Sequence, residues 1–178
     1  DWIKPCLQQI RNQKFNGTYE IILVDNMSKD ATVKIAKEYG VKKIVKIKKF
    51  LPGKAINDGI KKSAGSKIII ISAHCIPKSN LWLSKLYNSL NNQKIAGTYG
   101  RQLPLSSTSS DDARDLLVTF GNENKIQKKD PFFHNANSAF LKSTWKKFPF
   151  DEKVTNIEDR VWGHQVIKNN LQIIYEPS

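Results

Sequence analysis

A short polar run directly after an all-apolar strand is the first place in this sequence where chemistry could occur. Residues Ile68–Ile71 are four consecutive isoleucines, a pattern typical of a strand buried on both faces of a sheet. The run ends at Ser72, Ala73, His74 and Cys75. Ligands of open α/β sheets bind outside the carboxyl ends of the strands, so Ser72 and His74 are candidate binding residues. The simpler alternative is a buried strand followed by an ordinary loop, and this stretch alone leaves both open.

A second polar cluster follows another predicted strand, at residues 19–24. Its members are Asp25, Asn26, Ser28 and Asp30. The carboxyl ends of parallel strands lie on one edge of a sheet, so this cluster can share a cleft with His74. The alternative is that these side chains only form a turn and cap the following helix.

The elements that position these clusters alternate between helices and strands. Apolar spacing predicts a helix capped by Asp1, the strand 19–24, a helix 30–40, a strand 44–47, a helix 54–64 and the isoleucine strand. The alternation indicates a Rossmann-like α/β domain with a mostly parallel central sheet flanked by helices. Further helices are expected near 77–92, 115–120 and 159–169, with a short one from Ser143. Further strands are expected near 95–102, 132–141 and 171–175, and a loop at 121–130. We therefore expect residues 1–178 to form one domain.

The composition limits the partners of the chain. Its formal net charge of +13 is compatible with nucleic acid, an anionic membrane surface or an anionic small substrate. The lysines mostly alternate with apolar residues and are not interleaved with aromatic ones, so we expect attraction to an anionic membrane surface rather than nucleic-acid binding. No apolar run approaches the roughly 20 residues of a membrane span. Cys6 and Cys75 form neither a disulfide framework nor a metal motif, which predicts a reducing, cytoplasmic setting.

Several short motifs occur in order along the chain. They are residues 19–32, 52–60 and 64–67, the Asn137-Ser138-Ala139-Phe140 run, residues 149–152, and Glu158-Asp159 followed by Trp162. In this order the motifs resemble the family-two glycosyltransferases, which have the GT-A fold, and the resemblance covers nearly the whole chain. That family transfers a sugar from a nucleotide diphosphate to an acceptor hydroxyl, usually with inversion. The resemblance therefore implies an inverting, nucleotide-sugar-dependent glycosyltransferase.

The resemblance also implies where a nucleotide-sugar donor would bind. In the family, the base and ribose lie against the strand end that is Asp25-Asn26 here. A carboxylate there accepts hydrogen bonds from base or ribose, and an asparagine both donates and accepts. The full set of expected donor-binding residues is Asp25, Asn26, Ser28, Lys54, Asn57, Ser72, His74 and Arg101.

The position of the usual metal motif departs from the family. Family members carry Asp-x-Asp at the strand end that reads Ser72-Ala73-His74 here, and its carboxylates hold Mg²⁺ or Mn²⁺ against the diphosphate. Hard divalent cations prefer oxygen ligands, and imidazole is a softer choice. Two alternatives stay open. His74 gives a metal one bond, or His74 donates to phosphate directly while Lys54 and Arg101 supply positive charge.

Glu158 and Asp159 match the family's Glu-Asp motif, in which the aspartate is the general base. That chemistry needs one carboxylate within hydrogen-bond reach of the acceptor hydroxyl, opposite the leaving group. The alternative is a helix cap stabilised by the helix dipole. The resemblance further implies acceptor-side roles for Asn137 and Trp162, although Trp162 also fits the apolar core of its helix.

Family members begin with a strand before the helix that starts here at Asp1. The resemblance therefore implies a fragment that lacks this strand and a C-terminal tail. It also implies a glycan or lipid-linked acceptor, in surface polysaccharide or glycolipid synthesis for the cell envelope, by a cytoplasmic enzyme at the inner face of the membrane. Two alternatives remain. One is a nucleotidyltransferase on a similar fold. The other is a degenerate, non-catalytic domain that binds a glycan or nucleotide, which the Ser72-Ala73-His74 sequence keeps open.

Overall fold

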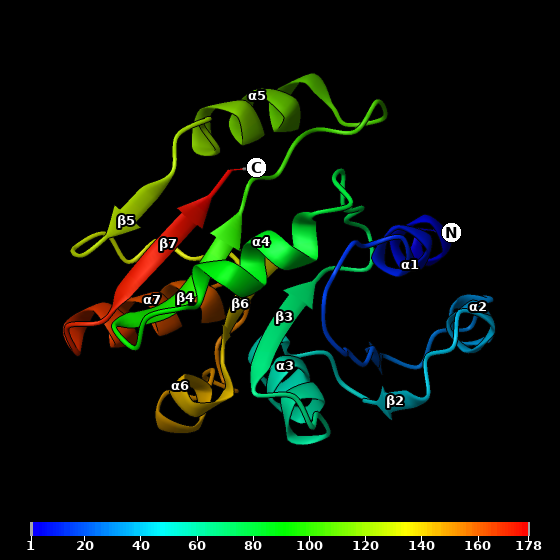
Figure 1. The fold of residues 1–178 in the computed structure, drawn as a ribbon. Coiled ribbons are helices and arrows are strands. Elements are labelled where there is room, and N and C mark those ends of the chain that lie inside the picture. The colour runs from blue at the N-terminus through cyan, green and yellow to red at the C-terminus, as the bar shows by residue number, and fades with distance from the viewer. Residues whose placement is uncertain (1, 178) are drawn as a thin grey trace.

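A computed structural model of the chain describes residues 2–177, so the predicted cap Asp1 lies outside the described residues. Within that range helices and strands largely alternate (Figure 1). The helices are α1 (Ile3–Arg11), α2 (Thr32–Glu38), α3 (Pro52–Lys61), α4 (Trp82–Ser89), α5 (Ser110–Thr119), α6 (Lys142–Lys147) and α7 (Glu158–Lys168). The strands are β1 (Ile22–Asp25), β2 (Lys43–Lys46), β3 (Lys67–Ile71), β4 (Ile95–Gly100), β5 (Lys125–Gln127), β6 (Asn137–Leu141) and β7 (Gln172–Glu176).

The strands form two sheets, and the larger one corrects the expected strand directions. Strands β1 and β2 are a parallel pair, whereas the larger sheet has the order β3-β6-β4-β7-β5. Only β4 and β7 pair parallel in it, and the other three pairs are antiparallel. The prediction of an α/β fold is confirmed, but the prediction of a mostly parallel central sheet is wrong. Strand β6 follows β5 with no helix between them, whereas a parallel connection requires a long crossover, usually a helix.

The antiparallel insertion of β6 has a consequence for the position of polar residues. Strand β6 lies between β3 and β4, with Ile71 opposite Asn137 and Tyr99 opposite Ser138. The beginning of β6 therefore lies at the edge where β3 and β4 end. The polar residues that follow β3 and β4 and those that precede β6 are consequently brought together.

One hydrophobic core covers each face of the sheets. The isoleucines of β3 divide between them, because Ile68 and Ile70 contact one core while Ile69 and Ile71 contact the other. Helices α3, α6 and α7 contribute to the first core, and α1, α2 and α4 contribute to the second. Figure 1 shows α4 across one face of the larger sheet. The run of four isoleucines therefore contacts a core on each face, as predicted, but only Ile68 is buried and the other three are partly buried, because β3 is the terminal strand of its sheet.

The region between β4 and β6 differs most from the expected elements. Helix α5 begins at Ser110, five residues before the predicted start, and Ser109 caps it by accepting from the backbone N–H of Asp112. Residues 125–127 form strand β5 rather than a loop. None of the side chains of α5 is buried, and Ile126 of β5 is 59% exposed. Neither element therefore carries the apolar periodicity from which it could have been predicted.

Candidate functional site

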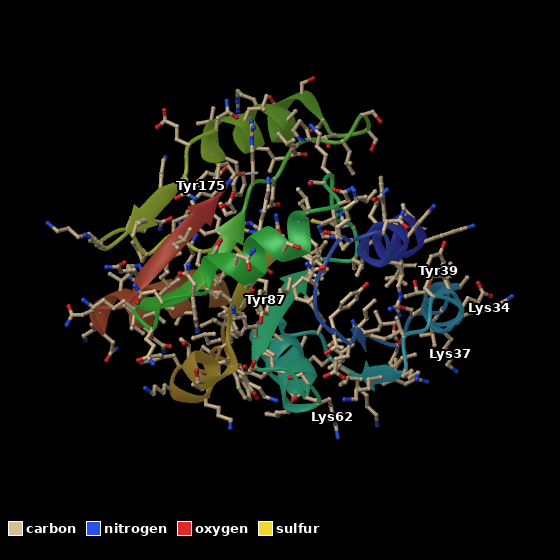
Figure 2. The ribbon with its side chains drawn as sticks, in the orientation of Figure 1. Lys34, Lys37, Tyr39, Lys62, Tyr87 and Tyr175 are labelled. Atoms are coloured by element: carbon tan, nitrogen blue, oxygen red, sulfur yellow. The ribbon has the colours of Figure 1, made fainter. Side chains whose placement is uncertain are left out.

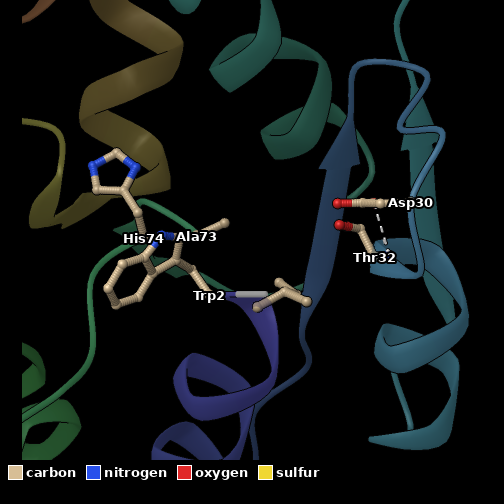
Figure 3. Close-up of a pocket in the computed structure, with 6 residues that line it drawn as sticks. Trp2, Asp30, Thr32, Ala73 and His74 are labelled. Atoms are coloured by element: carbon tan, nitrogen blue, oxygen red, sulfur yellow. Dashed lines mark hydrogen bonds between the residues drawn. The ribbon is translucent and has the colours of Figure 1, made fainter.

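A small cavity lies where the polar clusters after β1 and β3 meet. Its volume is about 310 Å³, and it is lined by Trp2, Ile3, Asp30, Thr32, Ala73 and His74. Figure 3 shows Trp2, Ala73 and His74 on one side of this cavity and Asp30 and Thr32 on the other. The sequence-based expectation that the two clusters share a cleft is confirmed for Asp30 and His74. We call this space the first cavity.

A larger groove of about 1150 Å³ lies on the other side of the loop that follows β3. Its wall includes the residues after β3 and β4 and the end of β7, among them His74, Arg101, Gln102, Asn137 and Pro177. We call it the second cavity. His74 lines both cavities. His74, which stands where the family resemblance expects the last aspartate of the metal motif, therefore borders both spaces.

The turn after β1 uses the polar side chains that were expected to contact the donor. Asp25 is 3% exposed, and its two carboxylate oxygens accept from the backbone N–H of Ser28 at 3.2 and 3.3 Å. Asp30 accepts from the backbone N–H of Thr32 at 3.0 Å. Asn26 and Ser28 are exposed and line neither cavity. Turn formation thus accounts for the bonds that Asp25 makes, although a carboxylate keeps capacity to accept further ones.

The segment before β6 connects the loop after β3 to the start of α7. The backbone N–H of Asn135 donates to Asp159 Oδ2 at 3.3 Å. One residue further along, the carbonyl of Ala136 accepts from the backbone N–H of Ser72 at 3.0 Å. The predicted general base and the predicted diphosphate-binding loop are therefore held by adjacent residues of one segment.

The two carboxylates at the start of α7 have different surroundings. Glu158 is 7% exposed and accepts from the side-chain amide of Asn135 at 3.4 Å. Burial, and secondarily the nearby charge of Asp159, raise the pKa of Glu158. Asp159 is only half-buried and lines neither cavity. Of the pair, Asp159 is the one that retains access to solvent and to a neighbouring ligand.

His134 lies beside this pair, in surroundings that lower its pKa. Its Nδ1 accepts from the backbone N–H of Ala136 at 3.3 Å and lies 3.0 Å from the side-chain amide nitrogen of Gln102. Two donors that face one ring nitrogen disfavour a proton on that nitrogen. Burial lowers the pKa of His134, the charge of Asp159 raises it, and the charge of Arg160 lowers it, with the net direction downward.

Two of the expected ligand-binding residues belong to the core instead. The Asn57 amide oxygen accepts from Trp145 Nε1 at 2.7 Å and from the backbone N–H of Phe150, and its nitrogen donates to the Phe150 carbonyl and to Glu152. Trp162 is fully buried, donates to the Phe148 carbonyl at 2.9 Å and stacks on Phe150. A donor-binding role for Asn57 and an acceptor platform at Trp162 are therefore contradicted by their burial.

Lys54 and Arg101, the two cations expected near the diphosphate, lie in different surroundings. Lys54 pairs with Asp58 at 2.9 Å on α3 and lines neither cavity. Arg101 lines the second cavity, and its Nη1 donates to Asn122. Its Nε is buried and has no hydrogen-bond partner within residues 2–177. Arg101 is therefore the better placed of the two for an anionic group in the second cavity.

The residues present do not form a carboxylate site for a hard divalent cation. Residues 2–177 contain no group of three or more His, Cys, Asp or Glu side chains that could hold a metal ion. At the end of β3 the chain offers one imidazole, from His74, where Mg²⁺ and Mn²⁺ prefer several oxygen ligands. Burial raises the pKa of the neighbouring Cys75 thiol, so Cys75 is a poor thiolate ligand as well.

Sequence reasoning did not single out Trp2 or Thr32. Trp2 lies one residue before α1 and is 48% exposed at the first cavity. Its indole offers a flat face to a base or sugar, which suits stacking. A tryptophan at the predicted surface of an amphipathic helix was the only signal that could have indicated it.

The chain matches a known protein family over most of its length. The sequence profile of glycosyl transferase family 2 matches residues 1–148, most of the chain. The chain therefore belongs to glycosyl transferase family 2. Glu158 and Asp159 lie beyond the matched residues. No curated protein sequence matches the chain significantly.

Solved structures share the fold at low sequence identity. A mannosyltransferase from Pyrobaculum calidifontis, in complex with GDP-mannose and Mn²⁺, superposes with a TM-score of 0.76 and 15% identity over 99% of this chain and 51% of its own. TarS from S. aureus gives 0.75 and 15%, over 99% and 57%. Glucosyl-3-phosphoglycerate synthase from Mycobacterium tuberculosis, with Mn²⁺, UDP-glucose and phosphoglyceric acid, gives 0.67 and 15%, over 94% and 61%. The chain thus has a GT-A fold and spans little more than half the length of these proteins.

Helix α7 depends on a glycine one turn after Asp159. A Cβ atom on Gly163 would lie 1.9 Å from the Pro131 carbonyl oxygen. We expect Gly163→Ala to lower the free energy of unfolding by roughly 1–3 kcal/mol, because this clash outweighs the gain in helix propensity of about 1 kcal/mol. Urea denaturation measures the change. Gly121→Ala is the control, since no heavy atom lies within 4 Å of its added Cβ. Equal midpoints for both variants would contradict the close packing of α7.

The lowered pKa of His134 predicts a pH dependence of stability. Above about pH 6.5, the ordinary histidine pKa, the imidazole is neutral in the folded and the unfolded chain. Below it the unfolded chain binds the proton first, so the free energy of unfolding decreases until folded His134 is also protonated. We expect this decrease, measured by urea denaturation from about pH 7.5 to about pH 5.5, to be smaller in His134→Gln than in the unmodified protein. His164→Gln, at an exposed position of α7, should keep the full decrease. The same slope in all three proteins would refute the assignment.

Proposed function

We propose that this chain transfers a sugar from a nucleotide-diphosphate donor to an acceptor hydroxyl with inversion at the anomeric carbon. The observation that carries the proposal is that His74 lines both cavities. A nucleotide in the first cavity with its diphosphate at His74 would direct the sugar toward the second cavity. Membership of glycosyl transferase family 2 supports this chemistry.

The first cavity suits the nucleoside part of the donor. It combines the exposed indole of Trp2 with the hydroxyl of Thr32 and the carboxylate of Asp30. An aromatic face stacks on a base, and hydroxyl or carboxylate oxygens accept from ribose hydroxyls. The bound GDP-mannose and UDP-glucose of the structurally similar proteins support this donor class.

The second cavity suits the acceptor. Its wall mixes hydrogen-bonding side chains, including Gln102 and Asn137, with apolar ones such as Leu103 and Leu105. Sugar rings present both hydroxyl edges and apolar faces, so a glycan or lipid-linked glycan fits such a wall. The guanidinium of Arg101, in the wall of this cavity, gives it a donor for a phosphate or carboxylate on the acceptor or on the leaving diphosphate.

Asp159 supplies the base in this proposal. It accepts the proton of the acceptor hydroxyl while that oxygen attacks the anomeric carbon, and the bond from that carbon to the diphosphate oxygen breaks on the opposite side. The negative charge on the departing diphosphate is met by His74 and Arg101. The hydrogen bond from Asn135 fixes Asp159 beside the segment that leads to Asn137 in the wall of the second cavity.

Titration with nucleotides tests the proposal directly. We expect calorimetry with UDP, dTDP and GDP to show binding of at least one, and that binding to survive excess chelator, because residues 2–177 contain no cluster of carboxylates that could hold a metal ion. His74→Ala should weaken binding roughly tenfold through loss of one hydrogen bond to a charged group, whereas His164→Ala should not. Binding that requires Mn²⁺ would instead assign a metal to His74. No binding of any nucleotide would overturn the proposal in favour of a degenerate glycan-binding domain.

The base assignment has its own test. Asp159→Asn keeps an oxygen that accepts from Asn135 but cannot take a proton at neutral pH. We expect sugar transfer to fall by roughly 10²- to 10⁴-fold while nucleotide affinity stays unchanged. Asp111→Asn, at an exposed position of α5, is the matched control and should transfer normally. Retained turnover in Asp159→Asn would exclude Asp159 as the base.

A further inference from the structure

The positive charge of the chain is concentrated in one stretch. Residues 29–67 contain twelve lysines and three acidic residues, a net charge of +9 out of the +13 of the whole chain. These residues form α2, β2 and α3 and the segments that join them. The lysines are scattered along the sequence, but the fold brings their elements together.

The elements of this stretch lie at one end of the molecule. Strand β2 pairs only with β1 among the described strands, so it forms the edge of the smaller sheet. Lys43, at the start of β2, donates to the carbonyl of Lys62, at the end of α3. Figure 2 shows Lys34 and Lys37 projecting from α2 and Lys62 projecting beyond α3, away from the body of the molecule. We call this region the basic edge.

Most lysines of the basic edge have no acidic partner. The ion pairs of the stretch involve Lys43, Lys54 and Lys61. Eight others are exposed and have no carboxylate partner within residues 2–177: Lys29, Lys34, Lys37, Lys42, Lys46, Lys48, Lys49 and Lys62. An exposed aromatic side chain, Phe50, directly follows two of them and is 56% exposed.

One segment away from the basic edge carries the opposite charge. Residues 106–124, which include α5, contain four acidic residues and one arginine. Figure 1 shows α5 on the far side of the molecule from α2 and β2. Such a charge distribution orients a protein in front of an anionic surface, with the basic edge toward it.

From the charge and the exposed Phe50, we propose that the basic edge docks on an anionic lipid bilayer. Lysines near a membrane of anionic lipids are attracted to it, and an aromatic side chain enters the headgroup region. The lysines line neither cavity and are not interleaved with aromatic side chains, as a nucleic-acid groove would require. Lysines on an edge strand such as β2 also prevent that strand from pairing with a strand of another molecule. That role does not explain the lysines on α2 or those that follow β2.

Docking of the basic edge would place the first cavity close to the membrane. Lys46 lies opposite Asp25 in the register of β1 and β2, so the basic edge reaches the carboxyl end of β1. Asp30 and Thr32 of the first cavity follow that end. No helix within residues 2–177 has the length and apolar character to cross a bilayer. Docking through the basic edge rests on its charge and on Phe50. The inference goes beyond sugar transfer and does not depend on it.

Vesicle co-sedimentation tests the inference on the full chain. We expect binding to vesicles of phosphatidylcholine with phosphatidylglycerol, none to pure phosphatidylcholine, and loss of binding as salt is raised. The variant Lys42→Gln, Lys46→Gln, Lys48→Gln, Lys49→Gln should bind at least about tenfold more weakly. The control Lys94→Gln, Lys128→Gln, Lys129→Gln, Lys168→Gln removes the same charge from exposed positions elsewhere and should bind nearly as the unmodified protein does.

Four outcomes would overturn the inference. In the first, the unmodified protein does not bind the mixed vesicles, and in the second it binds pure phosphatidylcholine equally well. In the third, the two quadruple variants weaken binding equally. In the fourth, the protein binds single-stranded RNA more tightly than anionic vesicles. Circular dichroism melting confirms that both variants are folded. Phe50→Ser should reduce the binding that persists at higher salt, because that fraction rests on apolar contact.

Discussion

The hydrogen bond from the backbone of Asn135 to Asp159 is the contact on which the candidate site depends. It exists only because β6 runs antiparallel between β3 and β4, which puts the beginning of β6 at the edge where its neighbours end. A parallel strand at the same place would bring its last residue there instead. The 134–137 segment then contacts three elements at once, through Ser72 after β3, Arg101 after β4 and Asp159 on α7. The departure from a parallel sheet is therefore what assembles the site.

The structural features that could be predicted are those that a short run of residues determines by itself. Four isoleucines specify β3, which contacts a core on each face. Gly40, with a φ of +74°, follows the end of α2, where a glycine of positive φ commonly ends a helix. The directions of β5 and β6 could not be predicted, because they depend on which strands they pair with rather than on their own residues. Asn57 and Trp162 were misassigned for a related reason. The partners of Asn57 lie about ninety residues away, so a motif asparagine and a structural asparagine look the same in sequence.

The charge on a leaving diphosphate must be met by something other than a carboxylate-bound metal if the chain is to use the donor proposed for it. His74 brings an imidazole to the position where acidic residues would recruit a divalent cation. An imidazole can donate a hydrogen bond to phosphate without first binding an ion, and Arg101 adds a fixed positive charge on the other side of the same loop. Hydrogen-bond donors and a bound metal ion can both stabilise the negative charge of a diphosphate. Hydrogen-bond donors do not require a cluster of acidic metal ligands, and residues 2–177 contain no such cluster.

The Glu-Asp pair at the start of α7 illustrates how burial assigns different roles to adjacent acids. Glu158 is enclosed, and the cost of burying its charge raises its pKa. Its contact with the Asn135 side chain therefore serves mainly to fix the segment, since a shielded carboxylate cannot reach a substrate hydroxyl. Asp159 shares the same helix terminus but is only half-buried. Its Oδ2 accepts from the backbone N–H of Asn135 and its Oδ1 from the backbone N–H of Arg160 at 2.7 Å, and each oxygen can accept one further hydrogen bond. Of these two adjacent acids, Glu158 is therefore suited to anchoring and Asp159 is the more accessible, and Asn135 donates a hydrogen bond to each.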